Sequence, residues 1–258
     1  MPTFFIRKRV EDNFMYIVQL FLLLFFVSSV FANDSALRTE VLPPGIAPIP
    51  AITPLVQPSS VEKIAPGIFR IGEIVINKHE KSISFPAQVN MDKGLLEYLL
   101  VRNGGKTHES LLRTLVEPYN LQLACLLLGL EGTSRPLAFQ GAPENPTGDM
   151  VELRITHADK GGKPINIRPE EWLATMQESK ATPVKNLALV YTGSIINEGR
   201  FLAQLEGSMI ALYHDPVAIV DNASPGGEIH SHWAIREGTV PAVGTTVTVT
   251  IRPKGNIR

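Results

Sequence analysis

The spacing of hydrophobic and polar residues divides the 258-residue chain into three parts. Residues 15–31 are mostly apolar, the next part combines apolar residues with frequent prolines, and from Ile68 onward apolar and polar residues alternate in short runs. Alternation with many β-branched residues predicts strands, because successive side chains of a strand point to opposite faces. We therefore expect a folded domain over residues 67–258, preceded by a proline-rich linker over residues 33–66 in which neither helix nor sheet can run far.

Three pairs of such runs predict β-hairpins. The runs at 68–78 and 82–90 meet at the polar turn "KHEK". The runs at 95–101 and 106–114 meet at "RNGG", whose glycines can adopt positive φ at a tight turn. A third hairpin is predicted within residues 148–167, with its turn at "DKGG".

Two segments predict helices. The sequence "PYNLQLACLLLGL" begins with Pro118, a residue favoured at the first position of a helix, and is apolar on nearly every side. It predicts a buried helix that is ended by the stretch from Gly129 to Gly132. The sequence "RPEEWLATM" predicts a short surface helix with Pro169 at its start. The fold class we expect is α+β: a mostly antiparallel β-sheet with one buried apolar helix and one short surface helix.

The N-terminal segment predicts the compartment. A basic cluster at residues 7–9 precedes the apolar run, and Val30 and Ala32 occupy the −3 and −1 positions of a signal-peptidase site. We expect residues 1–32 to be a signal peptide and the mature protein to be extracytoplasmic, in the periplasm or secreted. The alternative is an uncleaved N-terminal anchor, which would be the protein's only membrane contact. Met15 is an alternative start that would discard the basic cluster.

Charge and cysteine content exclude some classes of function. The formal net charge is −1 and basic residues are scattered, so the sequence does not predict a nucleic-acid partner. Cys125, in the apolar run, is the single cysteine of the chain. It cannot form an intramolecular disulfide or ligate an iron–sulfur cluster alone, and we expect it to be buried and unreactive.

The sequence "NGGKTHES" contains the end of a phosphate-binding loop, which has the pattern G-x-x-x-x-G-K-[ST]. The position of the first glycine is Leu100, so only half of the motif is present. A phosphate-binding lysine also opens a long helix, whereas Pro118 begins a separate helix soon afterwards. We therefore interpret the paired glycines as a turn.

The same segment contains candidate catalytic residues. If it is a strand, His108 and Ser110 share one face and Glu109 lies on the other. A serine beside a histidine suggests a nucleophile with its base, although the chain has no G-x-S-x-G sequence. Three interpretations stay open: a polar network that fixes the hairpin next to the buried helix, ligand binding, or a catalytic cluster of these three residues.

Histidines near the C-terminus suggest a metal site as an alternative. On a strand, His230 and His232 would project to one side, with His214 and Asp215 available as further ligands. Turn-forming residues flank "EIHSH", which makes strand geometry there doubtful. We therefore predict no metal and no cofactor, and keep the four residues as the alternative ligand set.

Several unlike motifs occur in one order: "GGKTHESLL", "LLLGL", "YTGS", "ALYHDPVAIV" and "PAVGTTVTVTIRP". Together they resemble the YdjY-type domain, a family of bacterial exported proteins of unestablished function, over about residues 66–253. Some relatives carry a ferredoxin-like iron–sulfur portion, which this chain lacks the cysteines to build. The resemblance implies that the distinctive residues are Gly105, Lys106, His108, Glu109 and Ser110, followed by Gly193, Ser194, Asp215 and Pro216, without assigning any of them a catalytic role.

Two hypotheses of function follow. The first is an exported, non-catalytic binding or structural module whose partner is an envelope ligand or protein and whose candidate binding residues are Lys106, Ser194 and Asp215. The second is an envelope hydrolase or metal-dependent enzyme that uses His108, Glu109 and Ser110.

Overall fold

The computed structural model describes residues 59–159, 161–178 and 180–255. These residues all belong to the second of two compact units, Met1–Leu55 and Val56–Arg258. The predicted signal peptide and most of the predicted linker lie outside the described residues. Residues 61–65, which the proline pattern places in the linker, form an edge strand of the folded unit.

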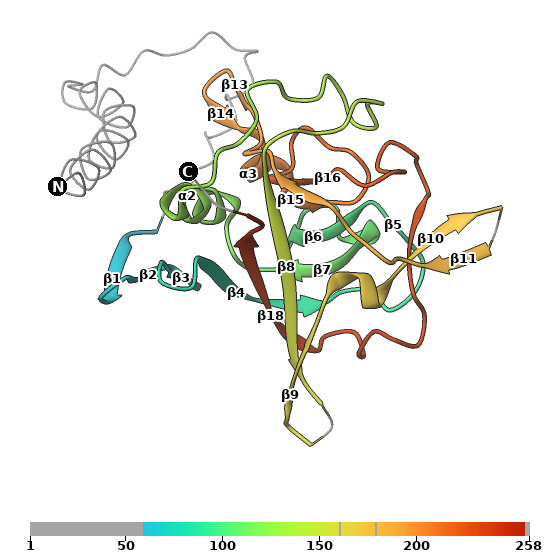
Figure 1. The fold of residues 1–258 in the computed structure, drawn as a ribbon, viewed down its shortest axis with the longest axis horizontal. Coiled ribbons are helices and arrows are strands. Elements are labelled where there is room, and N and C mark those ends of the chain that lie inside the picture. The colour runs from blue at the N-terminus through green and yellow to red at the C-terminus, as the bar shows by residue number, and fades with distance from the viewer. Residues whose placement is uncertain (1–58, 160, 179, 256–258) are drawn as a thin grey trace, which may run out of the picture. The chain divides into compact units, whose positions relative to one another are not determined.

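The described residues form strands, two short 3-10 helices (η1 and η2) and two α-helices (Figure 1). Their bounds are β1 (Val61–Ala65), β2 (Ile68–Ile71), β3 (Ile74–Asn77), β4 (Ser82–Val89), β5 (Leu95–Leu96), β6 (Tyr98–Arg102), η1 (Thr107–Glu109), β7 (Ser110–Thr114), α2 (Pro118–Leu128), β8 (Asp149–Ala158), β9 (Pro164–Ile167), η2 (Pro169–Trp172), β10 (Leu173–Gln177), β11 (Lys180–Pro183), β12 (Leu189–Tyr191), β13 (Ile196–Asn197), β14 (Arg200–Phe201), α3 (Leu202–Glu206), β15 (Ser208–Ala211), β16 (Val220–Asn222), β17 (Trp233–Ile235) and β18 (Thr246–Pro253).

Eight strands close into a mixed β-barrel in the order β4-β18-β8-β12-β16-β15-β6-β7, and β7 pairs back with β4. The pairs β6–β7 and β15–β16 are parallel, and the other neighbours in the barrel are antiparallel. Strands β1 to β3 extend the sheet from β4, β9 pairs with β8, and β11-β10-β17-β5 form a separate four-stranded sheet. The predicted α+β class with a mostly antiparallel sheet is therefore wrong: the domain is β-rich and built on a closed mixed barrel.

The predicted short surface helix is also wrong. Pro169 does start a helical turn, but the turn is the 3-10 helix η2, and the chain continues as strand β10 from Leu173. Leu173 and Ala174 are buried and pair with β17, so the hydrogen bonds of the four-stranded sheet replace those of a helix. Local helix signals are weak compared with such tertiary pairing.

The first and third predicted hairpins form as β3–β4 and β8–β9, although Gly72 divides the first run into β2 and β3. The second hairpin is wrong, because β6 and β7 are parallel, with Tyr98 opposite Ser110. The chain turns at Gly104, at φ 90°, and passes through η1 before β7 begins. The Nδ2 of Asn90 donates to the carbonyls of Thr107 and Ser110, and these bonds fix the returning segment.

The buried apolar helix is confirmed as α2, which begins at Pro118 and ends at Gly129 in the left-handed conformation, φ 92°. It packs against β3 and β4 (Figure 1). Cys125 is fully buried, as predicted, and burial raises the pKa of its thiol, which leaves it unreactive.

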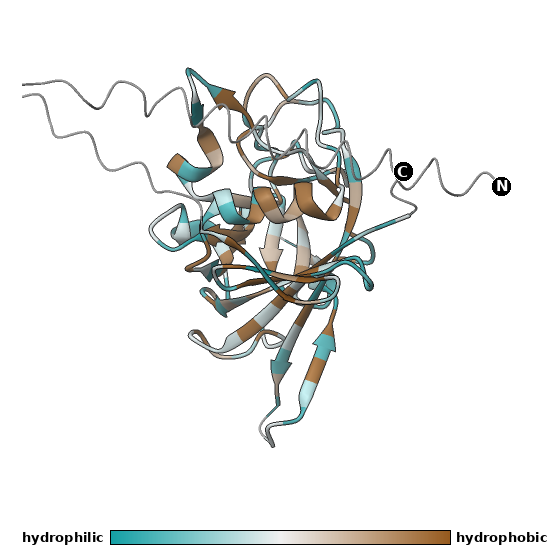
Figure 2. Cartoon of the chain, turned by 90° about the vertical axis from the view of Figure 1, so that its left-hand side faces the viewer, coloured by the Kyte–Doolittle hydropathy of each residue, from teal (hydrophilic) through white to brown (hydrophobic). Residues whose placement is uncertain are grey.

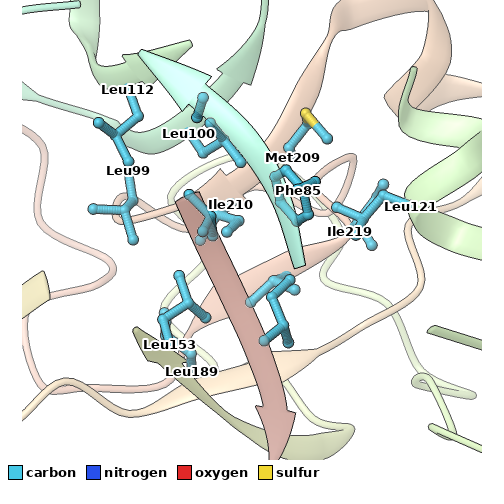
Figure 3. Packing of buried hydrophobic residues seen from close by; sticks show 14 of the residues in the cluster. Phe85, Leu99, Leu100, Leu112, Leu121, Leu153, Leu189, Met209, Ile210 and Ile219 are labelled. Atoms are coloured by element: carbon cyan, nitrogen blue, oxygen red, sulfur yellow. The ribbon is translucent and has the colours of Figure 1, made fainter. Parts of the chain in front are cut away.

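The core fills the barrel and the space beneath α2. Residues with opposite hydropathy alternate as bands along the strands (Figure 2). Phe85 and Ile210 from the barrel strands, and Ile219 just before β16, meet Leu121 of α2 in one apolar cluster (Figure 3). Among the described residues, no helix has both the length and the apolar character needed to cross a membrane.

Candidate functional site

Two short connections between parallel strands shape the candidate site. Residues 103–109 join β6 to β7, and residues 212–219 join β15 to β16. Most parallel connections need a dozen or more residues, so both of these crossovers are tight. They meet at Glu97, whose N–H donates to the carbonyl of Glu109 and whose carbonyl accepts from the N–H groups of Leu212 and Tyr213.

Three side chains join the two crossovers. The buried Tyr98 hydroxyl donates to Oδ2 of Asp215 at 2.7 Å, and Nζ of Lys106 donates to the same hydroxyl at 2.7 Å. The Lys106 ammonium also lies 3.8 Å from Asp215 Oδ2 and 5.0 Å from the centre of the Tyr98 ring. Burial, followed by the charge of Asp215, raises the pKa of Tyr98, so its hydroxyl remains protonated. We call Tyr98, Lys106 and Asp215 the inner network.

A second buried carboxyl group supports the inner network. Asp215 accepts the N–H of Val217 at 2.9 Å, and its own N–H donates to Oδ2 of Asp221 at 3.1 Å. Asp221 is fully buried, and its Oδ1 accepts the N–H of Asn222. Burial raises the pKa of Asp221 to about 8, with the charge of Asp215 acting in the same direction and the two backbone hydrogen bonds opposing it.

A second set of side chains lies toward solvent, beside the inner network. Oε1 of Glu97 lies 2.9 Å from Nε2 of His230, and Oε2 accepts Nε2 of Gln140 at 2.9 Å. Burial, followed by the charge of Glu97, raises the pKa of Glu109. We call Glu97, Glu109, Gln140 and His230 the Glu97 cluster. It contains two neighbouring carboxylates, an amide and an imidazole.

Of the candidate catalytic residues, His108 and Glu109 contact each other, and the hydroxyl of Ser110 is turned away to a backbone carbonyl. The side chain of His108 is 77% exposed, with Nε2 at 3.4 Å from Glu109 Oε2. Ser110 is 0% exposed, and its Oγ donates to the carbonyl of Leu112 at 2.7 Å. Since η1 holds His108 and Glu109 and β7 begins at Ser110, the face-sharing expected of a strand does not apply to them.

The candidate binding residues converge on the second crossover. Lys106 and Asp215 belong to the inner network, and Ser194 donates to the carbonyl of Val217 at 2.5 Å. Ser194 has a positive φ of 59°, and Gly193 beside it has φ 81°. The Ser194 hydroxyl is thus bonded to the backbone of the same crossover.

The alternative metal ligands are dispersed. The Nδ1 of buried His214 donates to the carbonyl of Ala142 at 2.8 Å, and its Nε2 has no hydrogen-bond partner among the described residues. His230 contacts Glu97, and the ring of His232 packs edge-on against Trp233. Within residues 59–159, 161–178 and 180–255, no three His, Cys, Asp or Glu side chains are placed to hold one metal ion.

Sequence reasoning missed four residues of the site: Glu97, Tyr98, Gln140 and Asp221. Glu97 and Tyr98 interrupt the apolar run "LLEYLLV", and two polar groups inside an apolar run are a signal that could have identified them. Gln140 lies in an irregular loop far away in sequence, and Asp221 looks like an ordinary polar position of a short strand. No local pattern marks either of them.

The fold and this site define a class: a β-barrel domain in which a buried tyrosine joins two parallel crossovers beneath a polar surface cluster. A family model for the YdjY domain matches residues 74–252, which is more than half of the chain, and the chain therefore belongs to the YdjY domain family. The resemblance drawn from the short motifs is confirmed. No curated protein matches the chain, and no solved structure does either.

Proposed function

We propose that the chain is an exported, non-catalytic binding module, and that the Glu97 cluster contacts its ligand, a saccharide or another small molecule of the bacterial envelope. The observation that carries the proposal is the adjacent placement of Glu97 and Glu109. Burial, with repulsion from the neighbouring Glu97 carboxylate added to it, raises the pKa of Glu109, so the arrangement disfavours the charged form of Glu109. A local conflict of this kind is typical of functional sites, because folding alone would select against it.

The inner network supports the proposal as a rigid base. Tyr98 uses its hydroxyl as donor to Asp215 and as acceptor for Lys106, so its bonding capacity is largely used within the protein. The Glu97 cluster, in contrast, presents an amide, an imidazole and carboxylates at the surface. A well-supported backbone holds the groups of a site in place, so that less conformational entropy is lost on binding.

Hydrolysis by the serine-centred cluster has less support. A nucleophile must reach its substrate, and the Ser110 hydroxyl is fully buried and bonded to a backbone carbonyl. Export is supported by the basic cluster at residues 7–9 and by the Val30 and Ala32 positions. Amino-terminal sequencing of the protein from an envelope fraction would test it, with Asn33 expected as the first residue.

Ligand binding is tested with the variant Glu97→Gln, which keeps the shape of the side chain and removes its charge. Saturation-transfer NMR with a panel of N-acetylated amino-sugar oligomers and polyamines should find a compound that binds the unaltered protein and binds Glu97→Gln at least ~10-fold more weakly. The matched control is Glu62→Gln, on the exposed edge strand β1 at the end of the sheet, which should bind as the unaltered protein does. A compound that is cleaved during the measurement, or equal binding by both variants, would contradict the proposal.

A further inference from the structure

A second polar site lies outside the barrel, at the seam where β7 closes on β4. In the strand register, Gln88 of β4 lies opposite both Arg113 of β7 and Thr246 of β18. Residues directly opposite on neighbouring strands lie about 5 Å apart and point to the same face. The next residues along, Val89, Leu112 and Val247, are buried in the core, so this polar row faces outward.

The row lines a groove of about 290 Å³. Its other walls include Pro86 and Leu115, and Leu115 is 73% exposed. A large apolar side chain at that exposure next to a concave polar surface offers an aliphatic contact for a ligand. Asn103, from the first crossover, and Glu73, from the turn between β2 and β3, complete the groove.

The charged groups of this groove are unpaired within the described part of the chain. Arg113 is half-buried, yet its guanidinium makes no ion pair or hydrogen bond with any of the described residues. Arg102 on the neighbouring strand, by contrast, pairs with Glu117 at 3.3 Å. Glu73 lines the same groove but does not form an ion pair with Arg113. A cation and an anion thus face one cavity without neutralising each other.

We propose that this groove binds a free α-amino acid with an apolar side chain. The planar guanidinium of Arg113 matches a carboxylate in bidentate geometry, and the amides of Gln88 and Asn103 flank it. Glu73 takes the ammonium group, and Leu115 with Pro86 contacts the aliphatic side chain. A zwitterion fits better than a phosphate, because the Glu73 carboxylate repels a dianion while it attracts an ammonium group.

The test uses L-leucine as the probe and ¹⁵N-labelled protein. Millimolar L-leucine should shift the backbone amide signals of Gln88, Arg113 and Leu115. Leucinamide lacks the carboxylate, and 4-methylpentanoate lacks the ammonium group, so each should bind at least ~10-fold more weakly than leucine. Inorganic phosphate should cause no saturable shift at the same residues.

Variants assign the two ends of the ligand. Arg113→Gln should weaken leucine binding at least ~10-fold. Glu73→Gln should weaken leucine binding and leave 4-methylpentanoate binding unchanged. Glu73 lies on an exposed turn, so this variant keeps the test valid if Arg113→Gln does not fold. Arg200→Gln is the matched control and should bind leucine normally.

The seam site is independent of the Glu97 cluster, so Glu97→Gln should also bind leucine normally. The proposal is overturned if leucine shifts no amide signals at the seam, if phosphate or 4-methylpentanoate binds as well as leucine, or if Arg113→Gln retains full affinity.

Discussion

Tyr98 shows at the level of one residue how this domain uses buried polar groups. Lys106 and Asp215 are far apart in sequence. Among the described contacts, both form a hydrogen bond with the hydroxyl of Tyr98, which lies on β6. Separate sequence motifs predict Lys106 and Asp215 as binding residues, and the two do lie 3.8 Å apart. No motif predicts their shared partner, because a tyrosine in an apolar run is also typical of a core residue.

Replacing Tyr98 by phenylalanine should lower the free energy of unfolding by about 1 to 3 kcal/mol, because the Asp215 carboxylate would lose a donor while staying buried. Chemical denaturation measures the change. The matched control is Tyr119→Phe: Tyr119 is half-buried and its ring packs on Phe201, with no hydrogen bond of its hydroxyl among the described residues. Equal losses in the two variants would show that the inner network contributes nothing.

Asp221 should make stability depend on pH. Its pKa is about 8 in the folded state and about 3.9 in an unfolded chain, so the folded protein binds more protons between these values. The proton on Asp221 therefore stabilises the folded state fully below about pH 4. This stabilisation is lost as pH rises to about 8, and the free energy of unfolding falls by on the order of 1 kcal/mol per pH unit over that range.

Denaturant midpoints measured from pH 5 to pH 8 should therefore fall less steeply for Asp221→Asn than for the unaltered protein. Asp221→Asn lowers stability at every pH, because an amide in this position cannot accept hydrogen bonds from both backbone N–H groups. The informative quantity is therefore the slope of the denaturant midpoint against pH. The exposed Asp92→Asn is the control and should leave the slope unchanged. Parallel slopes for all three proteins would contradict a protonated Asp221.

At the level of secondary-structure elements, the paired glycines decide how β6 connects to β7. Both a hairpin and a parallel crossover need a residue with positive φ, which Gly104 supplies, so the local signal cannot separate the two. The parallel arrangement is favoured because Leu111 and Leu112 of β7 are buried in the closed barrel. Gly105 is needed for a different reason: a Cβ there would lie 2.9 Å from the carbonyl oxygen of Glu206.

The two glycines should therefore respond differently to substitution by alanine. In Gly104→Ala the added Cβ has no atom within 4 Å, so only the positive φ lowers the free energy of unfolding, by about 1 kcal/mol. Gly105→Ala must push the crossover away from Glu206 and should cost about 1 to 3 kcal/mol, with a shift in the amide signals of Lys106 and Tyr98. Thermal unfolding and NMR measure both effects. A Gly105→Ala protein with an unchanged Lys106 signal would refute the close approach.

For the molecule as a whole, closure of the barrel depends on the last strand. Strand β18 pairs with β4 on one side and β8 on the other, and it buries Val247, Val249 and Ile251. The alternation in "TTVTVTIRP" predicts such a strand, but its place between two strands that are distant in sequence is a property of the barrel.

Truncation before Thr246 should abolish cooperative unfolding, because β4 and β8 would both lose their partner and the core its three apolar side chains. Truncation after Gly255 removes only the last three residues and should leave the transition unchanged. Thermal unfolding followed by circular dichroism shows which of the two truncated proteins keeps a cooperative transition. A cooperative transition in the shorter protein would show that the barrel closes without β18.

Local patterns in the chain were enough to identify most of the strands, the position and ends of α2, the burial of Cys125 and the family. Residue periodicity, proline and glycine signals, and motif order carry this information over short stretches. The parallel pairing of β6 with β7, the strand at Leu173–Gln177, the inward direction of Ser110 and the contact of Glu97 with Glu109 became visible only in the folded domain. Barrel closure fixes these features, because strand partners and buried faces depend on residues far apart in the chain.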